Sequence, residues 1–136
     1  MRGVPECLFC RIAAKQVPSK AVYEDAEIFA FEDINPQAPV HVLLVPKQHL
    51  AHTLDLTEAS APLLGRLVLA ANRIARERGV AESGFRLVLN TNRDGGQLIF
   101  HLHVHLLAGR PMGWPPGKGP RFRLTAERSP AYIYGD

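Results

Sequence analysis

Apolar and polar residues alternate most regularly in one stretch of the chain, QLIFHLHVHLLAGR. His101, His103 and His105 occupy alternate positions there, with leucine, phenylalanine and valine residues between and beside them. Successive side chains of a strand point to opposite faces of its sheet. The pattern therefore predicts a strand over residues 98–109 that carries three imidazoles on one face and an apolar surface on the other.

Three further stretches have the composition and the boundaries of strands. Residues 21–34 predict a hairpin, because apolar segments lie on both sides of the polar turn EDAE. Residues 40–45 are nearly all apolar and lie between two prolines, and residues 85–90 precede TNRDGG, a loop that suits a hairpin. On the histidine strand, the apolar side chains from Leu98 to Leu106 are expected in the core.

One long helix is predicted over residues 57–78, where apolar residues recur at helical spacing. Thr57 is expected to cap its start and Gly79 to end it, and a shorter helix near FCRIAA fits the pattern. The apolar stripe consists of Leu63, Leu64, Leu67, Val68, Ala71, Ile74 and Ala75. This order of elements predicts an α+β fold with a mostly antiparallel meander sheet and one long helix.

The composition indicates a single domain. The chain has 136 residues, of which 46% are hydrophobic, and its apolar runs are too short for a signal peptide or a membrane span. We therefore expect a cytoplasmic protein. The net charge of +3 comes with no basic run interleaved with aromatic residues, so nucleic-acid binding is not favoured. Residues 1–117 are expected to form the domain, and residues 118–136 a C-terminal tail.

The three alternating histidines admit three interpretations. They can lie on a solvated face, bind a metal together, or form a phosphate site. Strand positions two apart are roughly 6–7 Å apart at the backbone, so neighbouring imidazoles can serve one small ligand. We favour the phosphate site, because a neutral imidazole is a good nucleophile near pH 7 and a second imidazole can supply a proton.

Cys7 and Cys10 are the two cysteines of the chain, and they form a C-x-x-C motif. In a reducing compartment, this motif indicates a metal site or a redox pair more often than a structural disulfide. Its spacing is that of a zinc knuckle, which needs two further ligands. Two buried cysteines with no special chemistry are the remaining interpretation.

Several motifs resemble one protein family. HLHVHLL matches the pattern of the histidine triad (HIT) superfamily, in which three histidines alternate with apolar residues. FEDINPQAPVHVLLVPKQH, NTNRDGGQ and AGRPMGWPPG resemble the HINT branch, the histidine triad nucleotide-binding proteins, in the same order. The resemblance covers roughly residues 7–117. It implies a homodimer with one extended sheet, and a purine nucleoside phosphoramidase that cleaves the P–N bond between AMP and an amine.

The resemblance also implies roles for individual histidines. His103 corresponds to the nucleophile, which forms a nucleotidyl-histidine that water then hydrolyses. His105 corresponds to the residue that binds the phosphate and assists the proton, and His41 to a fourth histidine that supports the nucleophile. His49 and His101 are candidates to complete a zinc site with the two cysteines, as in bacterial proteins that the chain resembles. From its position alone, the favoured interpretation of His41 is a hydrogen-bonded buried histidine.

The remaining residues implied by the resemblance would bind the nucleotide. Asp33 resembles the carboxylate that holds the ribose hydroxyls, and Asn90 with the Gly95–Gly96 backbone resembles a phosphate cradle. Without the resemblance, Asp33 and the glycines read as turn residues, and the base-pocket candidates as core. The other nucleotide-binding candidates are Gln97, Ile28, Phe31, Ile34 and Trp114.

One residue departs from the family pattern. Leu98 follows GGQ where the animal-type members carry a serine that contacts the phosphate or the leaving group, which puts the rate and the leaving-group preference in question. Two other functions compete with the phosphoramidase. One is a dinucleoside polyphosphate hydrolase, and the other is a non-catalytic nucleotide-binding regulator or scaffold. The sequence does not distinguish adenosine from guanosine.

Overall fold

The computed structural model describes residues 4–116. Five strands form one antiparallel sheet in the order β1-β2-β3-β5-β4, and this confirms the predicted α+β fold with a mostly antiparallel sheet and one long helix. The elements in chain order are α1 (Leu8–Ala13), β1 (Ala21–Glu24), β2 (Ile28–Glu32), β3 (Val40–Pro46), η1 (Thr53–Asp55), α2 (Ala61–Glu77), β4 (Phe85–Val88), α3 (Asn92–Gly95) and β5 (Val104–Ala108). The predicted tail, residues 118–136, lies outside the described residues.

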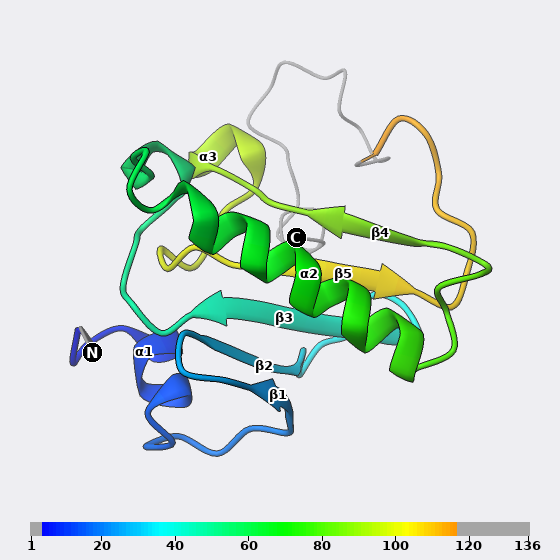
Figure 1. Ribbon diagram of the computed structural model, residues 1–136. Helices are drawn as coiled ribbons and strands as arrows, with labels where there is room; N and C mark the ends of the chain where they lie inside the picture. The colour runs from blue at the N-terminus through cyan, green and yellow to red at the C-terminus, as the bar shows by residue number, and fades with distance from the viewer. Residues whose placement is uncertain (1–3, 117–136) are drawn as a thin grey trace.

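The sheet buries a different apolar cluster on each of its faces. Helix α2 crosses one face (Figure 1), where its apolar stripe packs against alternate residues of β2, β3 and β5. On the opposite face, Phe29 and Phe31 of β2 pack with Phe9 and Ile12 of α1. Because side chains alternate along a strand, neighbouring residues of β2 enter different cores. This alternation later decides which predicted site residues share a face.

The long helix begins later than the sequence suggested. Thr57 was expected as its cap, but α2 starts at Ala61, and the Oγ of Ser60 accepts a hydrogen bond of 2.8 Å from the Thr57 N–H. Pro62 explains the start, because proline fits the first turn of a helix but not its interior. At the other end, Gly79 takes the positive φ of +73° that was expected of a terminating glycine.

The histidine strand is shorter than predicted. β5 begins at Val104, so His101 and His103 precede it. The side chains of Leu98 and Phe100, which were expected in the core, are 40% and 47% exposed, whereas Leu102, Val104 and Leu106 are buried as predicted. The segment before Val104 is held by a bond from the Leu102 N–H to the carbonyl of Leu50, 2.6 Å long, instead of by a strand ladder.

The connection between β4 and β5 contains one turn of helix. β4 ends at Val88, two residues before the predicted end of that strand, and α3 occupies the predicted hairpin loop. Gly96 ends α3 with φ +89°, a conformation that favours glycine. The turn redirects the chain so that the segment from residue 97 onward returns toward β3.

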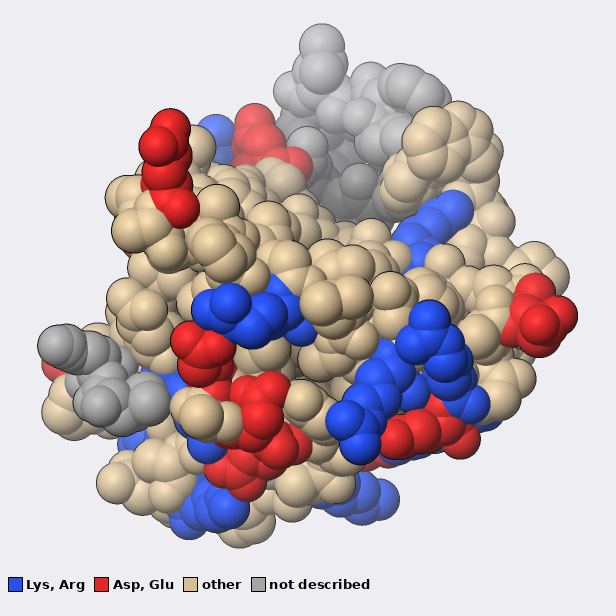
Figure 2. Space-filling model, viewed as in Figure 1, with Lys and Arg blue, Asp and Glu red and all other residues tan. Residues whose placement is uncertain are grey.

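Charged side chains of both signs mix on the face that carries α2 (Figure 2). Arg66 pairs with Glu27, and Arg73 pairs with Glu77 one helical turn away. Interleaved charges of this kind give the face no large field of one sign. None of the helices among residues 4–116 is long and apolar enough to cross a membrane.

Candidate active site and candidate metal centre

Three of the predicted site histidines converge on the face of the sheet opposite α2. His41 lies on β3 and His105 on the adjacent β5, and the Nε2 of His41 is 2.9 Å from the Nδ1 of His105. The ring of His103 lies against that of His105, with centroids 4.9 Å apart. All three imidazoles are at least 95% buried, because their exposed fractions are 1%, 5% and 2% for His41, His103 and His105.

Hydrogen bonds fix which nitrogen of His41 and His105 carries the hydrogen. The backbone N–H of Gln37 donates to the Nδ1 of His41 over 3.0 Å, so the neutral ring of His41 has its hydrogen on Nε2. That Nε2–H faces the Nδ1 of His105, which therefore accepts. His105 must then carry its own hydrogen on Nε2, and this buried atom has no partner among the described residues.

His103 has the opposite arrangement. Its Nδ1 lies 2.8 Å from the carbonyl oxygen of His101, and because a carbonyl only accepts, Nδ1 must carry the hydrogen. The Nε2 of His103 is left with a lone pair, and no hydrogen bond within residues 4–116 engages it. The cluster thus offers one free lone pair at His103 and one free N–H at His105.

Burial keeps these imidazoles neutral. It lowers the pKa of His41 and His103, although the negative charge of Asp33 opposes the fall at both rings. It lowers the pKa of His105 to about 3, with the neighbouring His103 and His41 adding to the effect. A neutral imidazole at pH 7 is the form that can act as a nucleophile.

Asp33 follows β2 and contacts the histidine cluster. Its Oδ2 lies 3.2 Å from the Nε2 of His41, and its Oδ1 accepts from the backbone N–H of Asn35 over 2.8 Å. The side chain is 15% exposed. The predicted ribose ligand is therefore also a direct neighbour of a catalytic candidate, a relation that the sequence alone did not indicate.

Of the groups predicted to bind phosphate, the Asn90 amide has no hydrogen-bond partner within residues 4–116, whereas the Gly96 N–H already has one. The Nδ2 of Asn90 is buried without a partner among the described residues, so it is a donor that a ligand oxygen could satisfy. The N–H of Gly96, by contrast, donates to the carbonyl of Arg93 over 3.0 Å, inside the α3 turn. The Asn90 amide is therefore free to bind a ligand, whereas the Gly96 amide serves the turn.

The side chain of Gln97, predicted to bind nucleotide, is used entirely within the protein. Its Oε1 accepts from the Asn92 N–H over 2.9 Å, and its Nε2 donates to the carbonyls of Ala51 and Ile99 over 2.8 and 3.0 Å. Gln97 is 3% exposed. It ties the loop that leads to the histidines to the segment after β3, and its role as a nucleotide ligand stays a prediction.

The residues predicted to form the base pocket do not come together as one wall. Ile28 belongs to the core under α2, so it faces away from the histidines and is not part of this site. Phe31 lies on the histidine face, but it is buried edge-on against Phe9, with ring centroids 5.4 Å apart. Ile34 and Trp114 are 99% and 83% exposed, so each is free to contact a ligand.

The second cluster contains Cys7, Cys10, His49 and His101, whose candidate ligand atoms all lie within 4.8 Å of one another. The Nδ1 of His101 is 3.3 Å from the Sγ of Cys7, and the Nδ1 of His49 is 3.3 Å from the Sγ of Cys10. Zinc bonds to sulfur and nitrogen imply a separation of roughly 3.6 Å between ligands in a tetrahedral site. The four residues therefore have the chemistry and the spacing of a zinc site.

The surroundings of the second cluster also suit a metal. The Nε2 of His101 lies 2.7 Å from the carbonyl oxygen of Pro46 and donates to it, which turns the lone pair of Nδ1 toward the thiols. Such an outer hydrogen bond is typical of histidines that bind metals. Burial lowers the pKa of His101 to about 4, so this ring is neutral at pH 7, and burial raises the pKa of the Cys10 thiol. A metal would have to displace the thiol proton.

The sequence missed two backbone groups that organise the histidines. The N–H of Gln37 sets the tautomer of His41, and the carbonyl of Pro46 sets that of His101. Every residue carries such groups, so residue identity gives no signal for them, and only the fold reveals them.

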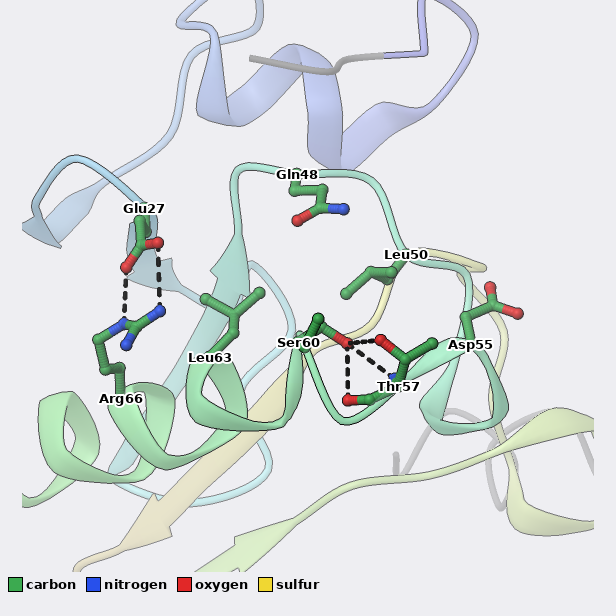
Figure 3. Close-up of a pocket in the computed structure, with 9 residues that line it drawn as sticks. Glu27, Gln48, Leu50, Asp55, Thr57, Ser60, Leu63 and Arg66 are labelled. Atoms are coloured by element: carbon green, nitrogen blue, oxygen red, sulfur yellow. Dashed lines mark hydrogen bonds and ion pairs between the residues drawn. The ribbon is translucent and has the colours of Figure 1, made fainter.

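A separate depression of about 360 Å³ lies at the start of α2, with the Leu50 and Leu63 side chains and the Glu27–Arg66 ion pair among its walls (Figure 3). Its lining includes no histidine or cysteine. It therefore belongs to neither of the two clusters.

Comparison with known proteins agrees with this geometry. The HIT domain family matches residues 14–112. Purine nucleoside phosphoramidase of Escherichia coli (strain K12) is 44% identical over 108 residues, 79% of this chain and 91% of that protein. The 14 kDa zinc-binding protein of Brassica juncea is 45% identical over 114 residues, 82% of this chain and 100% of that protein. A crystal structure of a HIT family hydrolase from Legionella pneumophila Philadelphia 1 superimposes with a TM-score of 0.81 at 47% identity, covering 82% of this chain and 100% of that one.

The chain belongs to the HIT domain family. The hydrolases among these relatives identify it as an enzyme of the hydrolase class.

Proposed function

We propose that the protein hydrolyses the P–N bond of purine nucleoside phosphoramidates, compounds in which a nucleotide such as AMP is joined to an amine. One observation carries the proposal. The histidine cluster presents a free lone pair on the Nε2 of His103 beside an unpartnered N–H on the Nε2 of His105. The 44% identity to a purine nucleoside phosphoramidase supports this choice of substrate.

In the first step, the Nε2 of His103 attacks the α-phosphorus. The new Nε2–P bond forms as the P–N bond to the amine breaks. The departing nitrogen takes up the Nε2 proton of His105 and leaves as a neutral amine. A proton from solvent restores the Nε2–H of His105. The nucleotide remains on His103 as a nucleotidyl-histidine, and the cationic His103 ring lies beside a neutral His105 ring.

In the second step, water attacks the same phosphorus. One water proton passes to solvent, the remaining hydroxyl bonds to phosphorus, and the bond from phosphorus to His103 breaks. AMP is released, and both histidines return to the neutral tautomers of the free protein. His41 holds the Nδ1 of His105 as an acceptor throughout, so the Nε2–H stays directed to the reacting group.

The nucleotide would be bound by groups around this cluster. The free Nδ2 of Asn90 suits a phosphate oxygen, and Gly95 would lie beside it because its backbone leaves room for an anion. Asp33 would accept hydrogen bonds from the ribose, and Ile34 and Phe31 would lie toward the purine. Trp114, which is 83% exposed, would contact the leaving group.

Zinc is the metal that the second cluster fits, with Cys7, Cys10, His49 and His101 as its ligands. Four protein ligands leave no open position, so the ion would stabilise the fold and take no part in the chemistry. Metal analysis of the purified protein beside the Cys7→Ser variant tests this assignment. About one zinc per chain is expected for the unmodified protein, and little for the variant.

We also propose that two copies form a homodimer through α2 and β4. β4 is an edge strand of the sheet, and Leu69 of α2 is 66% exposed. An unpaired strand edge beside an apolar helix surface is a common site of association. Light scattering coupled to size-exclusion chromatography should give a mass near twice 15.0 kDa.

Covalent trapping tests the reaction itself. The protein is incubated briefly with adenosine 5′-phosphoramidate labelled with ³²P and quenched, and the modified residue is identified by peptide mapping. Label on His103 supports the proposal. Turnover without label on His103, or with equal label in the His103→Ala variant, contradicts it.

A further inference from the structure

Asp33 is joined to His41 at two points, by its backbone and by its side chain. Its backbone N–H donates to the carbonyl of His41 over 3.0 Å. Its Oδ2 lies 3.2 Å from the Nε2 of His41, the same nitrogen that contacts His105. The third contact, from the Asn35 N–H to Oδ1, fixes the orientation of the carboxylate. These three contacts hold the Asp33 side chain against His41 in the absence of ribose, and binding a ribose would not require them.

One carboxylate, that of Asp33, and two imidazoles face His41. The imidazoles are His103 and His105, which burial keeps neutral. The carboxylate of Glu32 lies on the α2 face of the sheet, where it is bound to Arg78 and is 33% exposed, so its charge is largely compensated. Asp33 is 15% exposed and has no cationic side chain as a partner within the described residues. Its negative charge is therefore available to the histidines.

The proposed reaction creates a positive charge in this cluster. When the Nε2 of His103 bonds to phosphorus, its Nδ1 keeps the hydrogen that it donates to the carbonyl of His101. The ring then carries a full positive charge inside a buried site, where an uncompensated charge is costly. A nearby fixed carboxylate lowers that cost without any rearrangement.

We propose that Asp33 is a positioning residue of the histidine cluster, in addition to any contact with ribose. Together with the Gln37 N–H, it holds the hydrogen of His41 on Nε2, which keeps the Nε2–H of His105 directed to the substrate. It also supplies the counter-charge for the cationic His103 ring. This inference rests on the proposed phosphoramidase activity, and it separates catalysis from sugar recognition in a residue that the resemblance assigns to the sugar alone.

Two substrates distinguish the roles. Adenosine 5′-phosphoramidate has both ribose hydroxyls, whereas its 2′,3′-dideoxy analogue has neither. A carboxylate that served only the ribose would be irrelevant to the analogue. We expect Asp33→Asn to lower kcat on both substrates by a similar factor of roughly tenfold or more, because a carboxylate that orients an imidazole and stabilises its cation has effects of at least that size.

Glu32→Gln is the matched control. It removes the same charge one residue away, from a side chain that is bound to Arg78, and should change kcat on either substrate by less than about twofold. A ¹H–¹⁵N spectrum of the imidazoles gives a second readout. In the unmodified protein, His41 and His105 should show the Nε2–H tautomer, and Asp33→Asn should weaken that pattern at His41.

Each outcome has a distinct meaning. If Asp33→Asn impairs hydrolysis of the ribonucleoside substrate but leaves kcat on the dideoxy analogue unchanged, Asp33 binds ribose only and the inference is overturned. No loss on either substrate overturns it as well. If Asp33→Asn fails to fold, Asp33→Glu gives the same comparison, because it also displaces the carboxylate. If the unmodified protein cleaves neither substrate, the proposed function fails instead.

Discussion

His101 and His103 are two residues apart, yet they present opposite nitrogens to their surroundings. Each donates one N–H to a backbone carbonyl. His101 donates from Nε2 to Pro46, which turns its Nδ1 toward the cysteines, and His103 donates from Nδ1 to His101, which frees its Nε2. The backbone carbonyl to which an imidazole donates, and not its place in the motif, therefore decides which nitrogen is left free for a metal or a phosphorus atom.

The two clusters also differ in whether they are complete. In the cysteine cluster the candidate ligand atoms of all four residues face one another. In the histidine cluster the internal contacts use Nδ1 and Nε2 of His41 but leave one nitrogen of His103 and one of His105 without partners among residues 4–116. A closed set suits a structural ion, whereas an open set suits a substrate.

The largest effect should come from His103→Ala. Without the Nε2 lone pair no nucleotidyl-histidine can form, and kcat on adenosine 5′-phosphoramidate should fall by about a thousandfold or more. AMP affinity, measured by calorimetry, and metal content should stay close to those of the unmodified protein. His52→Ala, outside both clusters, is the control. Substantial turnover by the His103→Ala protein would break the division between the clusters.

Cys10→Ser should act on stability. It removes a ligand from the closed cluster, and a bound ion at a hundredfold excess over its Kd stabilises a fold by about 3 kcal/mol. We expect a loss of that order in urea unfolding and a metal content near zero. Treating the unmodified protein with a chelator should produce the same loss, and the variant should then be insensitive to the chelator. A variant as stable as the unmodified protein would refute the structural role.

His41→Phe should have an intermediate effect on activity. The aromatic ring fills the buried space but no longer holds the Nδ1 of His105 as an acceptor, so His105 is free to adopt the other tautomer. We expect kcat to fall by roughly tenfold to a hundredfold, as for other outer partners of site histidines. Nucleotidyl-His103 should still form in a trapping experiment. Unchanged kcat would show that the tautomer of His105 does not matter.

Acid should destabilise the protein through the buried imidazoles. The pKa of His105 is lowered to about 3, so between that pH and the ordinary value of 6.5 the unfolded chain binds the proton and the folded chain does not. The stability is therefore fully present above pH 6.5 and is lost as the pH falls toward 3. Each such histidine adds a slope of up to about 1.4 kcal/mol per pH unit. Urea unfolding from pH 7 to pH 4 measures it, and His105→Gln should flatten the slope.

Much of the fold could be predicted from local pattern. The hairpin of β1 and β2, strand β3 and helix α2 follow from alternation and helical spacing. The error at Leu98 and Phe100 arose because the alternation continues for several residues before the strand begins. There, the Gly96 turn and the side chain of Gln97 set the path of the chain. These are long-range contacts that no local period encodes.

The candidate site was predictable as a set of residues but not as a set of atoms. The resemblance to the family implied His41, His103 and His105, and the C-x-x-C spacing pointed to the two cysteines. The tautomers depend on the Gln37 N–H and on carbonyls brought in by folding. Ile28 was misplaced because alternate residues of β2 face opposite sides of the sheet. Phe29 and Phe31 lie on the histidine face, and Ile28 lies on the face under α2.

His101 serves the two clusters with different atoms, its ring for the one and its carbonyl for the other. A substitution of His101 replaces its imidazole ring but leaves its backbone carbonyl in place. A substitution at position 101 would therefore remove one ligand of the proposed zinc site and keep the carbonyl that orients His103, the proposed nucleophile. A change in the backbone conformation at residue 101 would have the opposite effect. The His101 ring would still face the cysteines, but the displaced carbonyl would no longer orient the ring of His103.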